Sequence, residues 1–217
     1  MKSPTETSLK FVGIDIGIKT LSFIKLELPA GSTLPSKTLK LSERMIHILK
    51  QTRIVIWDVV DFLPGKSATK TRHDVILDAL INYMRISQPD LLVSNSSIVL
   101  EAQRTSLMKK IQSSLYTLAR FISPEECSIS CQAASKKLNF SNYDIQILTK
   151  MNSMSLDISS YCKRKKASVK LCEYCLVWLS DNNEMFKKKF LAARKQDDLS
   201  DAFLHALVHA SETYVVR

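Results

Sequence analysis

The distribution of apolar and polar residues predicts three strands in the first third of the chain. An almost unbroken apolar run at residues 11–18 precedes a run at residues 21–28 in which apolar and polar residues alternate. This pattern predicts two strands joined by a tight turn. A third strand is expected at residues 53–63, where a Pro-Gly pair follows. Residues 29–51 are expected to form an irregular connection with a helical or strand-like tail.

After this region the pattern alternates between helical and extended spacing. The expected elements are a helix at residues 67–86, a strand at 96–103, a helix at 105–122, a short strand at 127–132, a polar loop at 139–160, and helices at 165–179 and 199–215. Antiparallel strands followed by strand–helix crossovers are typical of an α/β layer. We therefore expect one α/β domain over residues 1–217, a mixed five-stranded sheet flanked by helices, with residues 1–10 flexible.

Composition and charge indicate a compact protein with a polyanionic partner. The 217 residues are 45% hydrophobic and include only four Gly and six Pro, which suits a single folded core. A net charge of +10 and a pI near 9.4 favour nucleic acid as the partner. Two basic clusters stand out, Lys163-Arg164-Lys165-Lys166 with Lys170, and Lys187-Lys188-Lys189 with Arg194 and Lys195. Such clusters suit phosphate contacts, although any single lysine is more simply explained as a solvated surface residue.

Cysteine and histidine residues leave a zinc site as the less favoured alternative. The five cysteines are an odd number, so we expect a reducing compartment and no disulfide framework. Cys172 and Cys175 form a C-x-x-C without a second pair, within a helical apolar pattern. His205 and His209 have metal-binding spacing but are more simply read as packing or DNA-facing residues, although His205 follows Asp201 by one turn. No apolar run approaches the ~20 residues that cross a bilayer, so we expect no membrane partner.

Acidic residues occur at positions where apolar neighbours make a carboxylate costly. Asp15 lies within the first apolar run, where an unpaired carboxylate costs several kcal/mol. Taken alone, it is equally well explained by a partner such as Lys19 or by a turn cap. Glu101 ends the apolar stretch SIVL on an expected central strand, and functional sites form at strand ends in open α/β sheets.

A third group of acids opens the last predicted helix. Asp197, Asp198 and Asp201 precede an apolar helical stripe, and Asp198 and Asp201 would share one helix face. Favourable interaction with the helix dipole explains one acid in this position but poorly explains three. With Asp15 and Glu101 these acids would supply oxygen ligands for two Mg²⁺ or Mn²⁺ ions. Such a site suits hydrolysis of a nucleic-acid backbone.

Three motifs in this order resemble those of the RuvC-like Holliday junction resolvases. The segment GIDIGIKTLSF is similar to their first strand and turn, IVLEAQRTSL to their second motif in its fungal form, and KQDDLSDAFLHAL to their C-terminal motif. The closest similarity is to the fungal mitochondrial cruciform-cutting endonucleases. The resemblance spans residues 11–210 and implies an RNase H-like fold. It does not decide whether Asp197 or Asp198 is the metal ligand.

The resemblance further implies a mitochondrial homodimer that binds four-way DNA junctions and makes paired symmetric nicks. Gln103 and Arg104, beside Glu101, are candidate DNA contacts together with the Lys163–Lys166 run. The helix at residues 105–122 is a candidate dimer surface, with Met108 as an outward position. Two alternatives share the fold: an RNase H or exonuclease, and a nucleic-acid-binding module without activity. The actin-like ATPases are excluded because the chain is short and has no second phosphate loop.

Overall fold

A computed structural model of the chain describes residues 7–93, 96–138, 161–179 and 183–216. Its centre is a five-stranded mixed sheet in the order β3-β2-β1-β4-β5. The strands are β1 (Leu9–Ile16), β2 (Thr20–Leu28), β3 (Arg53–Asp61), β4 (Ser97–Ala102) and β5 (Ser128–Ala133). Neighbours are antiparallel among β1, β2 and β3, and parallel among β1, β4 and β5. This arrangement confirms the predicted sheet, and β1 begins at Leu9, inside the segment expected to be flexible.

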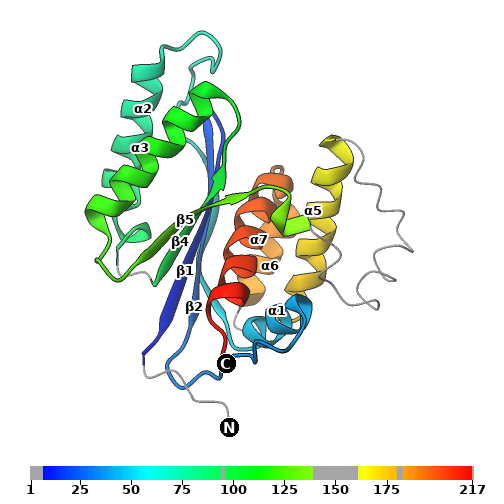
Figure 1. Cartoon of the computed structure of the whole chain (residues 1–217). Helices are drawn as coiled ribbons and strands as arrows, with labels where there is room; N and C mark the ends of the chain where they lie inside the picture. The colour runs from blue at the N-terminus through cyan, green and yellow to red at the C-terminus, as the bar shows by residue number, and fades with distance from the viewer. Residues whose placement is uncertain (1–6, 94–95, 139–160, 180–182, 217) are drawn as a thin grey trace.

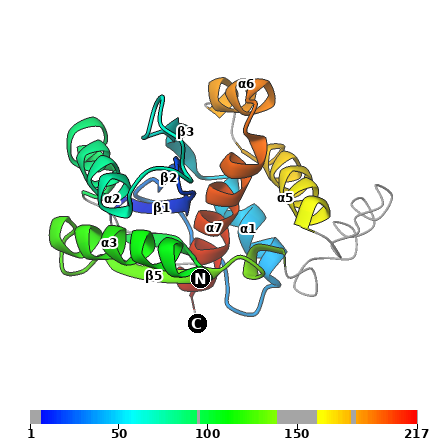
Figure 2. The same ribbon diagram turned by 90° about the horizontal axis from the view of Figure 1, so that it is seen from above.

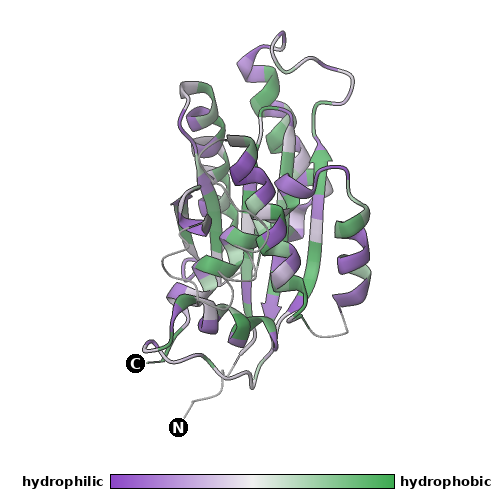
Figure 3. Ribbon diagram, turned by 90° about the vertical axis from the view of Figure 1, so that its right-hand side faces the viewer, coloured by the Kyte–Doolittle hydropathy of each residue, from purple (hydrophilic) through white to green (hydrophobic). Residues whose placement is uncertain are grey.

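Helices cover both faces of the sheet, as Figures 1 and 2 show. One face carries α2 (His73–Asn82) and α3 (Ser106–Ile122); the other carries α1 (Leu41–Leu49), α5 (Tyr161–Leu176), α6 (Glu184–Ala192) and α7 (Gln196–Thr213). Short helical turns are η1 (Tyr83–Ser87), η2 (Pro89–Leu91) and η3 (Lys136–Leu138). Each face has its own hydrophobic core. The helices alternate hydrophobic and hydrophilic residues, as amphipathic helices do (Figure 3). None of the described helices is long and apolar enough to cross a membrane.

Helix α7 lies against the middle of the sheet because β1 lacks a side chain there. A Cβ atom at Gly13 would stand 2.2 Å from the carbonyl oxygen of Ala202 and 2.9 Å from the Cβ of Ala206. Gly13 and these small helix residues therefore permit a close approach of α7 to β1. This close approach also brings Asp15 and Asp201 near each other, because Gly13 precedes Asp15 on the same strand face and Ala202 follows Asp201.

Some helix limits and one whole helix differ from the sequence-based predictions. The helix expected at residues 67–86 begins only at His73, and α5 and α7 begin earlier than predicted. Helix α6 was not predicted, because its lysine run obscures the apolar positions; Phe190 is nevertheless buried against Trp57, with ring centroids 5.0 Å apart. The polar loop predicted at residues 139–160 lies outside the described residues.

Three of the five cysteines, Cys127, Cys172 and Cys175, are buried and take part in packing. Cys172 and Cys175 are buried in the core on the α7 side of the sheet, and burial raises the pKa of the Cys175 thiol to about 12. Among the described residues, the cysteines do not belong to any group of side chains that lie close enough together to hold a metal ion. Cys162 is exposed, and all five cysteines are free thiols. The less favoured zinc alternative therefore has no support.

Candidate metal centre

Asp15 and Glu101 lie side by side because their strands are adjacent and parallel. The register pairs Ile14 of β1 with Leu100 of β4, so the next residue on each strand is a carboxylate. Side chains alternate between the two faces of a strand. Ile14 and Leu100 enter the core beneath α2 and α3, whereas Asp15 and Glu101 point toward α7. The carboxyl ends of two central strands thus present two acids to one face.

Helix α7 supplies the third acid. Asp201 faces the sheet, and oxygen atoms of Asp15, Glu101 and Asp201 lie within 4.8 Å of one another. Among the described residues, these three form the group of acids, histidines or cysteines that lie close enough together to share a metal ion. Lys19, the alternative partner considered for Asp15, instead pairs with Asp61 at 2.9 Å. Three predicted site residues, distant in sequence, therefore meet in space.

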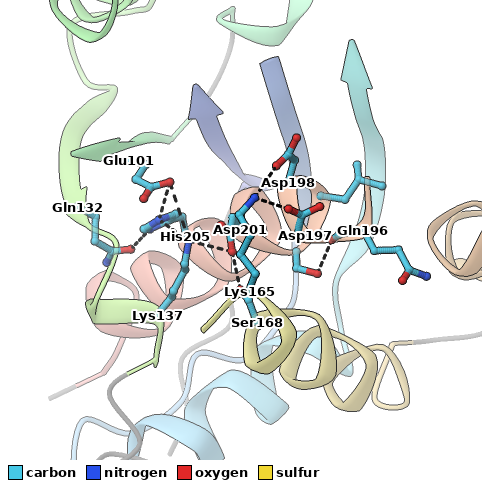
Figure 4. Close-up of polar contacts among 12 residues, drawn as sticks. Glu101, Gln132, Lys137, Lys165, Ser168, Gln196, Asp197, Asp198, Asp201 and His205 are labelled. Atoms are coloured by element: carbon cyan, nitrogen blue, oxygen red, sulfur yellow. Dashed lines mark hydrogen bonds and ion pairs between the residues drawn. The ribbon is translucent and has the colours of Figure 1, made fainter. Parts of the chain in front are cut away.

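A buried lysine beside the triad balances part of its negative charge. Lys137, in η3, is only 4% exposed in its side chain, and its Nζ lies 2.9 Å from Asp201 Oδ1 and 3.9 Å from Glu101 Oε2 (Figure 4). Ser168 of α5 also donates a hydrogen bond to Asp201 Oδ1, at 2.5 Å. One ammonium group among three carboxylates leaves a surplus of negative charge in a largely buried place.

The pKa values of the acids reflect this surplus. Burial, together with the neighbouring Glu101 and Asp201 carboxylates, raises the pKa of Asp15 well above its usual value. Burial also raises the pKa of Asp201, although Lys137 and Ser168 oppose the rise. For Glu101, burial alone would raise the pKa, but the hydrogen bond with Asp15 and the charge of Lys137 together lower it. The raised pKa of Asp15 thus reflects a place where negative charge exceeds positive charge.

The donor set fits a hard divalent cation. Carboxylate oxygens are the ligands that Mg²⁺ and Mn²⁺ prefer, and several carboxylates pointing at one place are stabilised by such an ion. The raised pKa of Asp15 is consistent with this fit, because a bound ion would release the proton and supply the charge. Asp15, Glu101 and Asp201 are the residues that would hold it.

His205 lies next to the triad, where it contacts Gln132 through one ring nitrogen and lies near Lys137 and Glu101 through the other. The His205 imidazole is fully buried, and its Nδ1 lies 2.8 Å from Gln132 Oε1. Its Nε2 lies 3.5 Å from Lys137 Nζ and 3.9 Å from Glu101 Oε2. Burial and the charge of Lys137 lower the pKa of His205 to about 3, so the ring is neutral. A neutral ring that donates from Nδ1 to Gln132 presents the lone pair of Nε2 to Lys137. Figure 4 shows how His205, Gln132 and Lys137 lie.

Asp197 and Asp198 stand one turn before Asp201 but outside the triad. The ammonium group of Lys165 pairs with Asp197, and it lies 3.5 Å from Asp198 Oδ1 (Figure 4). Lys195 Nζ lies 3.3 Å from the other oxygen of Asp198. The predicted five-acid cluster is therefore divided in this structure into a triad and a pair of ion-paired acids. Of the pair, Asp198 lines the same pocket as the triad, and Asp197 does not.

A pocket of about 580 Å³ opens over the triad. Gln103, Arg104, Arg164 and Lys165 line it, so four of the predicted DNA-contacting residues border the centre. Gln103 also braces the site, because its side-chain amide donates to the carbonyl of Ile16 at 3.3 Å. The exposed side chains of Lys163 and Lys166 lie outside the pocket. Their contact with DNA stays a prediction.

Sequence reasoning missed three residues of the site: Gln132, Lys137 and Ser168. Two of them lie where neighbouring residues hide the signal, since Lys137 follows another lysine and Ser168 lies in a helix beside a basic run. Gln132 alone had a readable signal. Gln132 is a polar residue on the same face of β5 as Ser128 and Ser130, and on this face its side chain points toward the site.

The position of Asp198 in the pocket leads to a test of the paired acids. For the nucleic-acid hydrolysis that the sequence predicts, Asp198→Asn should lower the rate more than Asp197→Asn, because only Asp198 faces the space above the triad. The rate constants of the two variants on one DNA substrate under single-turnover conditions provide the comparison. A larger loss for Asp197→Asn would assign the role to Asp197 instead.

Comparisons with known proteins support the fold on structural grounds alone. No protein-family model and no curated protein sequence matches the chain. Two solved structures of the fowlpox virus Holliday junction resolvase are similar in structure. The first, in complex with its substrate Holliday junction DNA, has a TM-score of 0.52 and 14% identity, and covers 93% of this chain and 96% of the resolvase chain. The second has a TM-score of 0.54 and 12% identity, and covers 93% and 97%. The chain therefore has the RNase H-like fold that it shares with this viral resolvase.

Proposed function

We propose that the protein is a metal-dependent DNA endonuclease that resolves four-way junctions by paired symmetric nicks. The observation that carries this proposal is the triad of Asp15, Glu101 and Asp201, within 4.8 Å, at the base of a pocket with basic walls. Asp15, Glu101 and Asp201 would hold divalent ions, and such ions would supply activation of a water and stabilisation of the leaving oxygen of a phosphodiester. A pocket with arginine at its rim suits a phosphate backbone.

The chain's own residues have separable tasks in this reaction. The triad would hold the ions, and Lys137 keeps Asp201 and Glu101 in place while offsetting part of their charge. His205, held by Gln132, keeps the ammonium group of Lys137 on the triad side. Arg104 and Arg164, which line the pocket, would bind phosphates of the DNA backbone.

The choice of a four-way junction as substrate is supported by two observations. The sequence motifs resemble those of the RuvC-like resolvases, and the similar solved structures are of a resolvase, one with Holliday junction DNA. An RNase H or exonuclease would use a similar centre. An inactive binding module is disfavoured because the triad, its lysine and its pocket are all present. Cleavage of a junction compared with an RNA–DNA hybrid in Mg²⁺ tests the proposal.

The first basic cluster provides a test of DNA binding. Changing Lys163, Arg164 and Lys166 to Ala should weaken junction binding and flatten its dependence on salt, since each lost phosphate contact releases about one counterion fewer. All three side chains are exposed, whereas Lys165 is engaged with Asp197 and Asp198 and is left unchanged. Affinity measured over a range of salt concentrations gives the slope. As a control, Lys187 and Lys189 contact backbone carbonyls of the protein, so their exchange should alter the slope less. An unchanged slope in the triple variant would place its residues away from DNA.

We further propose a homodimer, because symmetric nicking of a two-fold junction requires two centres in a fixed relation. The prediction that Met108 points outward on α3 was wrong: Met108, Ile111, Leu115 and Ala119 are buried against the protein's own sheet. The apolar residue that α3 exposes is Phe121, at 90%. Phe121→Glu should therefore shift a dimer toward monomer in sedimentation, whereas Thr117→Glu, also exposed on α3, should not. An unmodified protein that sediments as a monomer while making paired nicks would contradict the proposal.

A mitochondrial location is proposed on the resemblance to the fungal mitochondrial endonucleases. The free thiols of all five cysteines are compatible with a reducing compartment, which includes the mitochondrial matrix. Imaging of the tagged full-length protein in its source cells, with a matrix marker, tests this. Exclusion from the organelle would remove the fungal mitochondrial subtype from the proposal.

A further inference from the structure

Lys165 occupies an unusual position between the basic surface and the metal centre. Its neighbours Lys163, Arg164 and Lys166 are exposed, but Lys165 is partly buried and turns toward α7. There its ammonium group contacts Asp197 and lies 3.5 Å from Asp198 Oδ1. The side chain is 29% exposed and borders the pocket, so it remains accessible to a ligand that enters. Lys165 therefore lies between two acids of α7 and the place where a phosphate would bind.

Asp198 has both carboxylate oxygens engaged by cations. Lys165 lies beside Oδ1, and Lys195 lies 3.3 Å from Oδ2. The side chain is only 14% exposed and borders the pocket, one helical turn before the triad residue Asp201. A divalent ion near Asp198 would have to approach an ammonium group already held there, and the two positive charges repel each other. The ion pair thus competes with metal for Asp198.

A phosphodiester would alter this competition. The ammonium group of lysine binds phosphate readily, and its flexible four-carbon stem allows it to move between partners. DNA in the pocket would place a negative charge near Lys165 and Arg164. Transfer of Lys165 to that charge would leave Asp198 Oδ1 free at the edge of the triad. Lys195 is half exposed, so solvent screens its remaining contact with Oδ2.

We propose that Lys165 withholds Asp198 from the metal centre until DNA binds. In the free protein the triad binds one divalent ion, and Lys165 occupies Asp198. A phosphodiester in the pocket draws Lys165 away, and Asp198 then helps to bind a second ion. This inference rests on the proposed function and adds a specific positioning residue to it. Its consequence is that the full set of ions assembles only on substrate.

The number of Mn²⁺ ions bound by the DNA-free protein tests the proposal. Equilibrium Mn²⁺ binding, followed by the loss of the free-ion electron paramagnetic resonance signal, gives the count per chain. The wild type should bind one ion at a free Mn²⁺ concentration at which Lys165→Gln binds two. The double variant Lys165→Gln/Asp198→Asn should return to one, which assigns the second ion to Asp198. Two ions on the wild type, or one on Lys165→Gln, would overturn the proposal.

Two control variants separate the effect of the Lys165 charge on ion binding from the effect of altering any residue of this helix. Lys165→Arg keeps a cation at this place and should stay at one ion, and Lys166→Gln removes a neighbouring charge on the same helix and should also stay at one. With a nicked duplex bound, the product of junction cleavage, the wild type should reach two ions. A count that stays at one with the nicked duplex would exclude release by phosphate. Because the DNA-free counts do not depend on cleavage, a protein that fails to cut junctions would refute the proposed function without altering these results.

Discussion

Asp15→Asn, Glu101→Gln and Asp201→Asn should each lower the rate of junction cleavage by roughly 10³-fold or more while leaving junction binding nearly unchanged. The expected size follows because metal-ion catalysis contributes several kcal/mol and each 1.4 kcal/mol is about a tenfold change in rate. Binding should persist because the basic residues at the pocket rim and on α5 are untouched. Single-turnover cleavage in Mg²⁺ and a binding assay in chelator measure the two effects.

Asp61→Asn is the matched control for these substitutions. Asp61 also ends a strand at this edge of the sheet, but it pairs with Lys19 and does not belong to the triad. Its cleavage rate should stay close to that of the unmodified protein. Full activity of any one triad variant in Mg²⁺ would remove that residue from the centre.

Of the triad variants, Asp15→Asn should be more stable than the wild type when metal is absent. The pKa of Asp15 is raised in the folded protein, so its contribution to stability is present below the unfolded-state value near 4 and is lost as pH rises through the folded-state value. Asp15→Asn removes the titrating carboxyl group, so the variant does not lose this stability as pH rises. In chelator its midpoint of unfolding should exceed that of the wild type at neutral pH, and the difference should shrink toward pH 4. Added Mg²⁺ should stabilise the wild type and not the variant.

Lys137→Met should destabilise the metal-free protein by about 3–5 kcal/mol at neutral pH, the usual cost of removing one partner from a buried ion pair. Lys137 is 4% exposed and lies 2.9 Å from Asp201, whose carboxylate would keep its burial and lose its cation. The charge of Lys137 lowers the pKa of Glu101 and opposes the rise at Asp201, so both pKa values should increase in the variant. The destabilisation should therefore decrease as pH falls and the acids become protonated.

Urea unfolding at about pH 5 and about pH 8 measures this pH dependence. Lys136→Met is the matched control, because the adjacent lysine pairs with Glu212 at the surface, where such pairs contribute about 0–1 kcal/mol. An equal loss at the two pH values, or a loss no greater than that of the control, would show that Lys137 does not neutralise the triad.

The sheet and the triad were predictable because each depends on a strong local signal. A carboxylate within an apolar strand is costly, so Asp15 and Glu101 stood out, and their strand ends meet once the order of the sheet is known. Asp201 was predicted as one of three acids that precede the apolar stripe of the last helix. The division between Asp201 and the ion-paired Asp197 and Asp198 was not predictable, because it depends on where α5 places Lys165.

The remaining features depend on contacts between segments that are far apart in sequence. Lys137 shows no feature in the sequence that separates it from Lys136, yet one is buried beside the triad and the other pairs at the surface. Helix α6 has a weak apolar pattern, and its burial of Phe190 against Trp57 becomes visible only in three dimensions. Gly13 is similar: only the packing of α7 shows why no side chain fits there.

Strand-by-strand mapping of the cuts in a four-way DNA junction tests the proposed function of this centre. The purified protein is incubated in Mg²⁺ with a four-way junction labelled on each strand in turn, and in parallel with a linear duplex and an RNA–DNA hybrid of the same sequence. We expect nicks at symmetric positions on two opposing strands of the junction, and no comparable cleavage of the other two substrates. Cleavage of the hybrid with the junction left intact, or nicks on single strands without symmetry, would contradict it.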